Sequence, residues 1–230
     1  MLKGVLIDWG GVLTTSLHEA ISEWLVADGI DALHYRELMT ELIREAYDGD
    51  GRGNPIHALE RGEVEVAEFE RDLAARLLTI EGGPPVAEGL LARMFAGFRP
   101  VPLMYEMLVA ARAAGVVTCL LSNSWGDHYI RDGWDDYFDR IVISGEVGMR
   151  KPEPAIFHHA LGLVGLPAER CVFVDDIVAN VDAARALGLV GVHHREAEAT
   201  IAEMEELLGH PLRPSGPSGT AGGAAAGTLV

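Results

Sequence analysis

Several polar residues of this chain stand directly after short apolar runs, where the end of a buried strand would place a catalytic group. Asp8 follows Val-Leu-Ile and is followed by Trp9 and two glycines. Lys151, in Gly-Met-Arg-Lys-Pro, comes a few residues after the third such run. The other groups are Ser122-Asn123, Ser144 and Asp175-Asp176. Parallel strands end at one edge of a sheet, so we expect five of these side chains to converge: Asp8, Ser122, Lys151, Asp175 and Asp176.

The carboxylates of this set suit phosphoryl transfer through a covalent aspartyl-phosphate. A free aspartate has a pKa of about 3.9, so Asp8 is expected to be ionised at neutral pH and to act as the nucleophile. Mg²⁺ prefers carboxylate, carbonyl, water and phosphate oxygens. We therefore expect Asp8, Asp176 and the carbonyl of Gly10 to hold Mg²⁺, with Asp175 bound to the ion or next to it.

The remaining groups suit the binding of a phosphate. Ser122 and Asn123 can donate hydrogen bonds to phosphate oxygens, and Lys151 can pair with both Asp8 and the phosphoryl group. Each group also has an ordinary structural explanation: Ser-Asn often makes a turn, Lys-Pro often precedes a helix, and Asp-Asp often caps one. Their shared position at strand ends favours a single site.

Alternating apolar and amphipathic segments predict the elements that carry these residues. Strands are expected over residues 5–7, 116–121, 140–144, 170–174 and 189–193, with helices between the later ones. This alternation predicts an α/β fold with a parallel, Rossmann-like sheet.

The segment after the first strand has a different pattern. Residues 16–98 show helical periodicity almost throughout, including a helix expected over 86–98, and they give no strand signal. We therefore expect a core of residues 1–15 and 99–210 with an inserted helical cap of residues 16–98. The last segment, 211–230, is rich in Gly, Ala, Ser and Pro and is expected to be a disordered tail.

Composition narrows the range of partners. The formal net charge of −17 would repel nucleic acid and anionic membranes, so neither is expected to bind. No signal peptide or membrane-spanning stretch is recognisable. The two cysteines, Cys119 and Cys171, lie inside apolar runs and are expected to be buried thiols. A cytoplasmic protein is expected, and its oligomeric state cannot be read from the sequence.

The order Asp8-Trp-Gly-Gly-Val, Leu-Ser122-Asn123, Lys151-Pro and Val-Asp175-Asp176 resembles the four motifs of the haloacid dehalogenase (HAD) superfamily. The helical insert resembles its C1-type cap. The Gly-Gly variant and the Leu-Glu-Arg-Gly-Glu stretch of the insert are most similar to the branch that contains the phosphatase domain of soluble epoxide hydrolase. The resemblance covers residues 1–208 and implies a HAD-like core, Asp8 as nucleophile, Ser122 and Lys151 as phosphate binders, and Asp175 and Asp176 for Mg²⁺. Asn180 matches a frequent helix position and is given a structural role.

One residue departs from the family pattern. Phosphatases of the superfamily usually carry a second Asp two residues after the nucleophile, and this chain has Gly10 there. General acid–base help is worth about 10²–10⁴-fold in rate. Either the substrate has a good leaving group, or another residue substitutes, or the protein binds its ligand and barely hydrolyses it. Asp127 and His128 are the nearest substitutes in the sequence.

The function expected from these residues is Mg²⁺-dependent hydrolysis of a small phosphorylated metabolite. Two alternatives remain: a hydrolase of carbon–halogen bonds, and a weakly catalytic protein that binds a phosphorylated ligand. Thr15, Trp24 and Arg52 of the insert and its junction are possible substrate contacts.

Overall fold

The chain folds around a parallel sheet of five strands. A computed structural model describes residues 1–47, 53–129 and 131–213. The strand order is β3-β2-β1-β4-β5, and all four pairings are parallel. The strands are β1 (Gly4–Ile7), β2 (Val117–Ser122), β3 (Arg140–Ile143), β4 (Cys171–Asp175) and β5 (Val190–His193). The predicted α/β fold with a parallel sheet is confirmed.

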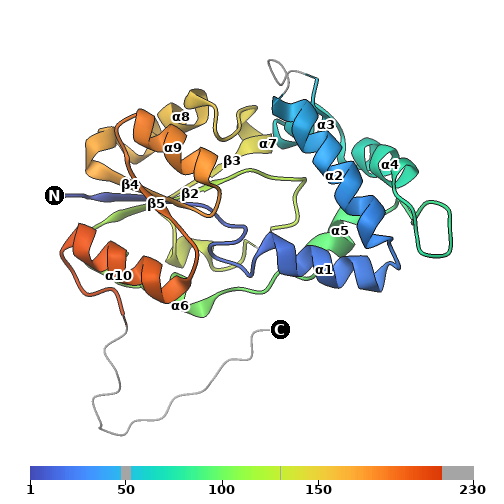
Figure 1. Cartoon of the computed structure of the whole chain (residues 1–230). Coiled ribbons are helices and arrows are strands. Elements are labelled where there is room, and N and C mark those ends of the chain that lie inside the picture. Colours follow the sequence, from blue (N-terminus) through green and yellow to red (C-terminus); the bar gives the residue numbers. More distant parts are fainter. Residues whose placement is uncertain (48–52, 130, 214–230) are drawn as a thin grey trace, which may run out of the picture.

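Alternating residues of the strands fill two hydrophobic layers, one on each face of the sheet. On β1, Leu6 points into one layer, whereas Val5 and Ile7 point into the other. Because both faces are buried, the strands appear in the sequence as continuous apolar runs. The helices α8 (Pro154–Val164) and α9 (Val178–Ala186) cover the Leu6 face; α6 (Pro102–Ala113) and α10 (Ala197–Leu208) cover the other (Figure 1).

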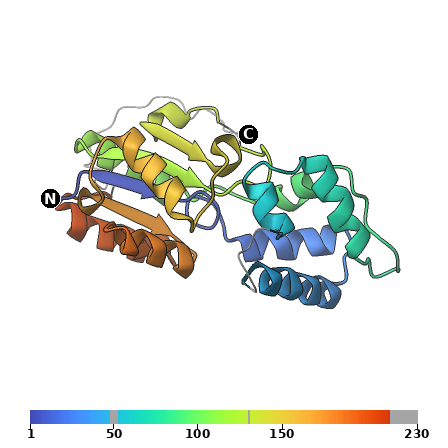
Figure 2. The same ribbon diagram turned by 90° about the horizontal axis from the view of Figure 1, so that it is seen from above.

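Five helices between β1 and α6 pack around a hydrophobic cluster of their own. They are α1 (Leu17–Ala27), α2 (Ala32–Tyr47), α3 (Pro55–Glu60), α4 (Val66–Arg76) and α5 (Leu90–Phe95). Figure 2 shows these helices grouped beside the sheet, beyond the carboxyl end of β1. The chain leaves and re-enters the sheet side by side, because Thr15 N–H donates to the Arg99 carbonyl and Val101 N–H to the Leu13 carbonyl, at 2.8 and 2.9 Å. In the described parts of the chain, no helix has both the length and the apolar character to cross a lipid bilayer.

The helix expected over residues 86–98 is shorter than predicted. It begins only at Leu90, because Gly89 takes a left-handed backbone conformation with φ of 69°. The Glu70 carboxylate of α4 accepts the N–H groups of Gly89 and Leu91, at 3.1 and 2.9 Å. A side chain from another helix thus caps α5, which local periodicity does not reveal.

Two other element ends also differ from expectation. The strand expected over 140–144 ends at Ile143, and Ser144 is the first residue of α7 (Ser144–Val147). At the carboxyl end of the chain, Leu212 is buried in the core, where its N–H donates to Glu205. The rest of the expected tail, 214–230, lies outside the described residues.

Candidate active site

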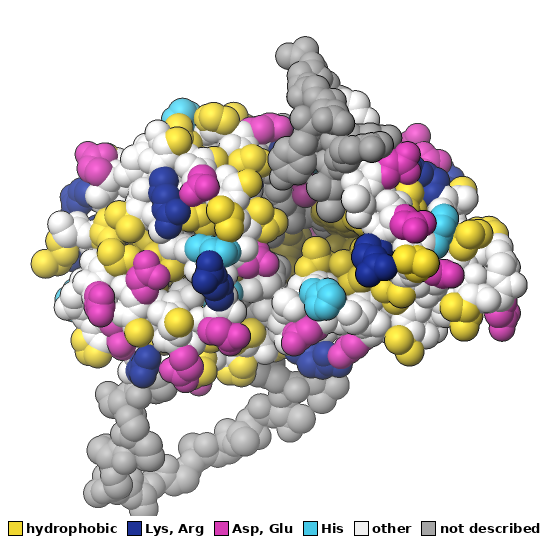
Figure 3. Space-filling model, in the orientation of Figure 1, with side chains coloured by type: hydrophobic (Ala, Val, Ile, Leu, Met, Phe, Trp, Pro, Cys, Tyr) yellow, Lys and Arg dark blue, Asp and Glu magenta, His cyan; other side chains and the backbone are white. Residues whose placement is uncertain are grey.

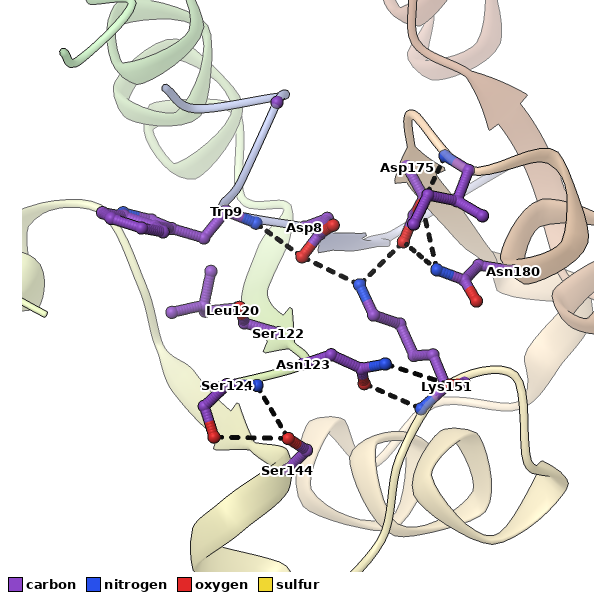
Figure 4. Close-up of polar contacts among 12 residues, drawn as sticks. Asp8, Trp9, Leu120, Ser122, Asn123, Ser124, Ser144, Lys151, Asp175 and Asn180 are labelled. Carbon is purple, nitrogen blue, oxygen red and sulfur yellow. Dashed lines mark hydrogen bonds and ion pairs between the residues drawn. The ribbon is translucent and has the colours of Figure 1, made fainter. Parts of the chain in front are cut away.

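Lys151 joins two of the carboxylates that the sequence places at strand ends. Its Nζ lies 2.8 Å from Asp8 Oδ1 and 2.7 Å from Asp175 Oδ2 (Figure 4). Asp8 follows β1 and Asp175 ends β4, and these strands pair with Ile7 opposite Val174. The register therefore brings both carboxylates to the same level of the sheet edge. All three side chains are buried, with Lys151 only 1 % exposed.

Asp175 is held by hydrogen bonds on both of its oxygens. Asn180 Nδ2 lies 3.1 Å from each oxygen, and Ile177 N–H donates to Oδ1 at 2.8 Å. Together with Lys151, these donors occupy most of the acceptor capacity of the carboxylate. Asp175 therefore serves to orient Lys151, and the structural role expected for Asn180 agrees with its contacts.

Three carboxylates lie near a single ammonium, and burial and neighbouring charges shift the pKa values of Asp8, Asp176 and Lys151. Burial raises the pKa of Asp8 to about 7; Lys151 opposes this shift, and Asp175 and Asp176 add to it. Burial and then the charge of Asp175 raise the pKa of Asp176 to about 6. Burial favours neutral Lys151, but Asp175 and Asp8 outweigh it and raise the pKa of the ammonium. The site thus has more negative charge than its own lysine offsets.

The donor set fits a divalent cation that prefers oxygen ligands. Asp8, Asp175 and Asp176 each place one carboxylate oxygen within 4.8 Å of the others. Asp176 remains partly exposed, whereas Asp175 is fully buried and occupied. Gly11 lies directly against Asp176: its φ is +74°, and a Cβ atom there would collide with Asp176 Oδ2. The fit to Mg²⁺ is therefore best through Asp8 and Asp176, with Asp175 beside them.

Ser122 ends β2, the neighbour of β1 on the side opposite β4, and Asn123 follows it. Asn123 forms a reciprocal pair with the backbone of Lys151: Lys151 N–H donates to Oδ1 at 2.8 Å, and Nδ2 donates to the Lys151 carbonyl at 3.0 Å. The Asn123 amide therefore fixes the lysine loop and has less capacity for phosphate than we expected. Ser122 Oγ lies 2.9 Å from the Tyr129 hydroxyl. Ser144, which the sequence places at a strand end, begins α7, and its hydroxyl accepts the N–H of Ser124 in the loop after β2.

A cavity of about 200 Å³ lies above these residues, between the sheet edge and the helices α1–α5. Figure 3 shows a hollow with hydrophobic side chains between these two parts of the molecule. The floor is polar and is formed by Asp8, Ser122, Lys151 and Asp176 among others. The walls carry mostly aromatic and aliphatic side chains: Trp9, Leu17, Phe95, Phe98, Trp125, Tyr129 and Ile177.

Neither Gly10 nor Asp127 supplies the second acid of the family pattern at the cavity. Gly10 lines the cavity, and a Cβ atom there would meet only Phe98 Cζ, at 4.0 Å. Asp127 is exposed and pairs with Arg131 at 3.0 Å, away from the cavity. His128 does line the cavity, and burial lowers its pKa. Its Nε2 is buried and has no hydrogen-bond partner among the described residues.

Two of the other expected substrate contacts, Thr15 and Trp24, do not line the cavity. Trp24 is buried in the cluster of the five helices, where its Nε1 donates to Asp28 at 3.1 Å. The Thr15 hydroxyl accepts the N–H of Arg99 at the junction between insert and sheet. Arg52 lies outside the described residues.

Glu60 of α3 is a cavity residue that the sequence did not single out. The residue is buried, and its carboxylate accepts hydrogen bonds from Trp125 Nε1, at 3.2 Å, and from Arg150 Nε. One residue of the insert thus contacts the loop after β2 and the residue that precedes Lys151. Glu60 lies in the Leu-Glu-Arg-Gly-Glu stretch, which indicates family similarity but does not by itself reveal these contacts.

Comparison with known proteins identifies the family of the chain. The family model of haloacid dehalogenase-like hydrolases matches residues 2–188. A sesquiterpene phosphatase of Aspergillus oryzae is 32 % identical over 156 residues, which cover 65 % of this chain and 77 % of the relative. Rat bifunctional epoxide hydrolase 2 is 31 % identical over 114 residues, or 46 % of this chain and only 21 % of the much longer relative. The resemblance seen in the four motifs is confirmed.

The fold has solved counterparts. A HAD family enzyme of Bacteroides thetaiotaomicron, solved as an Asp-to-Ala variant with magnesium and inorganic phosphate, superposes with a TM-score of 0.62 at 23 % identity. The alignment covers 85 % of this chain and 95 % of that one. At this identity the likeness concerns the fold.

Proposed function

The chain belongs to the haloacid dehalogenase-like hydrolase family, and from this premise we propose that it is a Mg²⁺-dependent phosphatase of small phosphomonoesters. The observation that carries the proposal is the position of Lys151, 2.8 Å from Asp8 and 2.7 Å from Asp175 at the floor of the cavity. A buried ammonium between a nucleophilic carboxylate and an orienting one suits a reaction that transfers a dianionic group.

In the proposed reaction, an oxygen of Asp8 attacks phosphorus, and the bond between phosphorus and the ester oxygen breaks. The alcohol leaves and takes its proton from solvent, because Gly10 offers none. Water then attacks phosphorus of the aspartyl-phosphate, which releases inorganic phosphate and restores Asp8. Ser122 and Lys151 donate to the phosphoryl oxygens throughout, and Asn123 keeps the Lys151 loop in place.

Asp8 and Asp176, with the carbonyl of Gly10, would hold Mg²⁺, and Asp175 would support them. When bound, the ion offsets the repulsion between the carboxylates and the phosphate. The fit of the three carboxylates supports this part of the proposal. So does the magnesium that accompanies phosphate in the Bacteroides enzyme.

We propose an apolar alcohol as the leaving group. The cavity walls are built largely from Trp9, Phe95, Phe98, Trp125 and Tyr129. Lys151 is the only lysine or arginine among the cavity-lining residues that the structure describes, so a second anionic group on the substrate would have no counter-ion there. The name of the Aspergillus relative, a sesquiterpene phosphatase, points to the same chemistry.

Residues 16–98 would act as a cap that closes over the substrate, and residues 1–15 and 99–210 as the catalytic core. The separate hydrophobic cluster of α1–α5 supports this division. So does the contribution of Leu17, Glu60 and Phe95 to the cavity. The proposal includes a cytoplasmic location with neither nucleic acid nor membrane as a partner; it rests on the charge of −17 and on two buried free cysteines.

The test is hydrolysis of p-nitrophenyl phosphate, a long-chain alkyl phosphate and a sugar phosphate, each with Mg²⁺ and with EDTA. We expect metal-dependent release of phosphate, fastest from the apolar esters, and complete loss in Asp8→Asn. Gly10 stands where phosphatases of the family usually carry a second acid, so a carbon–halogen hydrolase remains the alternative. A 2-chloro acid is therefore assayed in parallel. Release of chloride with no release of phosphate would favour a carbon–halogen hydrolase, and no release of either would favour a binding protein.

A further inference from the structure

Tyr129 places its hydroxyl against the last residue of β2. Tyr129 Oη and Ser122 Oγ are 2.9 Å apart, and both residues line the cavity whose floor carries Asp8. The chain folds back between the two residues, so the contact depends on the loop after β2. Among the described residues, Ser122 Oγ has no other hydrogen-bond partner.

The phenol ring is fixed by its neighbours. The rings of Trp9 and Trp134 pack edge-on against it, with centroid distances of 5.0 and 5.6 Å. The guanidinium carbon of Arg131 lies 5.9 Å from the ring centroid. Because Trp9 directly follows Asp8, this packing fixes the position of the Tyr129 ring relative to the end of β1 that carries the carboxylate. A supporting group that is locked by packing holds its hydrogen bond at little further entropic cost.

Either hydroxyl can donate in this hydrogen bond, and a phosphate anion bound at Ser122 would select the direction. Burial raises the pKa of Tyr129 above its usual range, so the phenol keeps its proton at neutral pH. A serine hydroxyl has one proton and two lone pairs. If Ser122 accepts from Tyr129, its own proton is free to point into the cavity. If Ser122 instead donated to Tyr129, its hydroxyl would present only a lone pair to a phosphate anion, which is repulsive.

On the basis of the proposed phosphatase function, we infer that Tyr129 is a positioning residue for phosphoryl transfer: its hydroxyl donates to Ser122, and Ser122 donates to the phosphoryl group. No proton is transferred along this chain of two hydrogen bonds. The first bond orients the second and polarises it, because consecutive hydrogen bonds strengthen one another. Ser122 contacts the substrate, and Tyr129 acts through Ser122.

A double-mutant cycle of Tyr129→Phe and Ser122→Ala tests this inference. Tyr129→Phe removes one oxygen and keeps the ring that packs on Trp9. We expect kcat/KM for p-nitrophenyl phosphate to fall about three- to tenfold, the size of one neutral hydrogen bond. The inhibition constant of inorganic phosphate should rise by a similar factor. In the Ser122→Ala protein, Tyr129→Phe should change neither quantity further.

Tyr137→Phe is the matched control, because that ring packs in the core against Tyr105 and does not line the cavity. It should match the wild type, and equal thermal midpoints should show that all variants fold. The inference is overturned if Tyr129→Phe matches the wild type, or if it costs the same with and without the Ser122 hydroxyl, since Tyr129 would then act independently of Ser122. A wild-type protein that hydrolyses no phosphate ester would refute the proposed function instead, and direct binding of inorganic phosphate to the four proteins would still test the role of Tyr129.

Discussion

The ammonium of Lys151 lies 2.8 Å from the carboxylate of Asp8 inside the protein, where neither side chain has much contact with solvent. Removing one partner of such a pair leaves an uncompensated buried charge, which costs about 3–5 kcal/mol. In Lys151→Met, two carboxylates lose their counter-ion. We expect turnover to be lost and the free energy of unfolding to fall by about this amount at pH 8.

The loss of stability in Lys151→Met should be smaller at pH 6. The pKa of Asp8 is already raised to about 7 and rises further without the ammonium, so the folded variant takes up a proton as the pH falls. Urea unfolding at both pH values measures this difference. Lys3→Met is the control, because Lys3 is the only other lysine of the chain and is partly exposed. Equal losses at pH 6 and pH 8 would contradict the assignment of Asp8 as the group that titrates.

Mg²⁺ should stabilise the wild-type protein more at pH 8 than at pH 5.5. The folded pKa values of Asp8 and Asp176 are raised to about 7 and about 6, so the folded protein binds these protons more tightly than the unfolded chain. Their contribution to stability is therefore present at low pH and is lost as the pH rises through 6 to 7. A cation that binds the ionised carboxylates offsets this loss and competes with protons at low pH.

Thermal unfolding with and without Mg²⁺ at the two pH values measures the effect. Asp176→Asn should lose most of the gain at pH 8, whereas the exposed Asp127→Asn should keep it. A gain of the same size at both pH values would mean that the ion binds away from Asp8 and Asp176.

The positions at strand ends could be predicted from the sequence because they depend on a local rule. A buried parallel strand appears as an apolar run, so the residue after it must lie at the sheet edge, as Asp8 and Asp175 do. The register supplies the rest of the arrangement: Ile7 lies opposite both Leu120 and Val174, so the ends of the three strands lie within two residues of one another along the sheet edge.

What the sequence could not give are contacts between side chains of distant segments. The cap of α5 by Glu70, the pairing of Asn123 with Lys151 and the meeting of Tyr129 with Ser122 each depend on how loops fold back. No periodicity encodes such contacts. For the same reason the sequence predicts Asn123 as a phosphate binder, whereas its amide forms hydrogen bonds with the backbone of Lys151.

Glu60→Gln should weaken catalysis through the position of the insert. The side chains of Glu60 and Arg150 are only 9 % and 12 % exposed, and the pair connects α3 to the residue before Lys151. A hydrogen bond between charged groups in such a place contributes about 1.5–3 kcal/mol. We expect kcat/KM for p-nitrophenyl phosphate to fall about tenfold or more.

Glu63→Gln is the matched control for Glu60→Gln. Glu63 pairs with Arg61 nearby, but its side chain is 53 % exposed, and surface ion pairs contribute about 0–1 kcal/mol. Steady-state kinetics of Glu60→Gln, Glu63→Gln and Arg150→Gln distinguish the effect of the buried Glu60–Arg150 pair from that of an exposed ion pair. If Glu60→Gln and Glu63→Gln behaved alike, the buried pair would have no part in catalysis.

Gly10→Asp should speed up the hydrolysis of esters with poor leaving groups. The position has room: a Cβ atom would contact only Phe98 Cζ at 4.0 Å, whereas at Gly11 it would collide with Asp176. A carboxyl group two residues after Asp8 could protonate the leaving oxygen, and general acid catalysis is worth about 10²–10⁴-fold. p-Nitrophenolate needs little such help. We therefore expect kcat for an alkyl phosphate to rise by about tenfold or more and kcat for p-nitrophenyl phosphate to change little. Gly10→Asn, which matches the size but carries no acidic proton, should give no such gain. A similar response of both esters to Gly10→Asp would mean that leaving-group protonation does not limit the rate and that a group already in the cavity, with His128 the first to examine, supplies the proton.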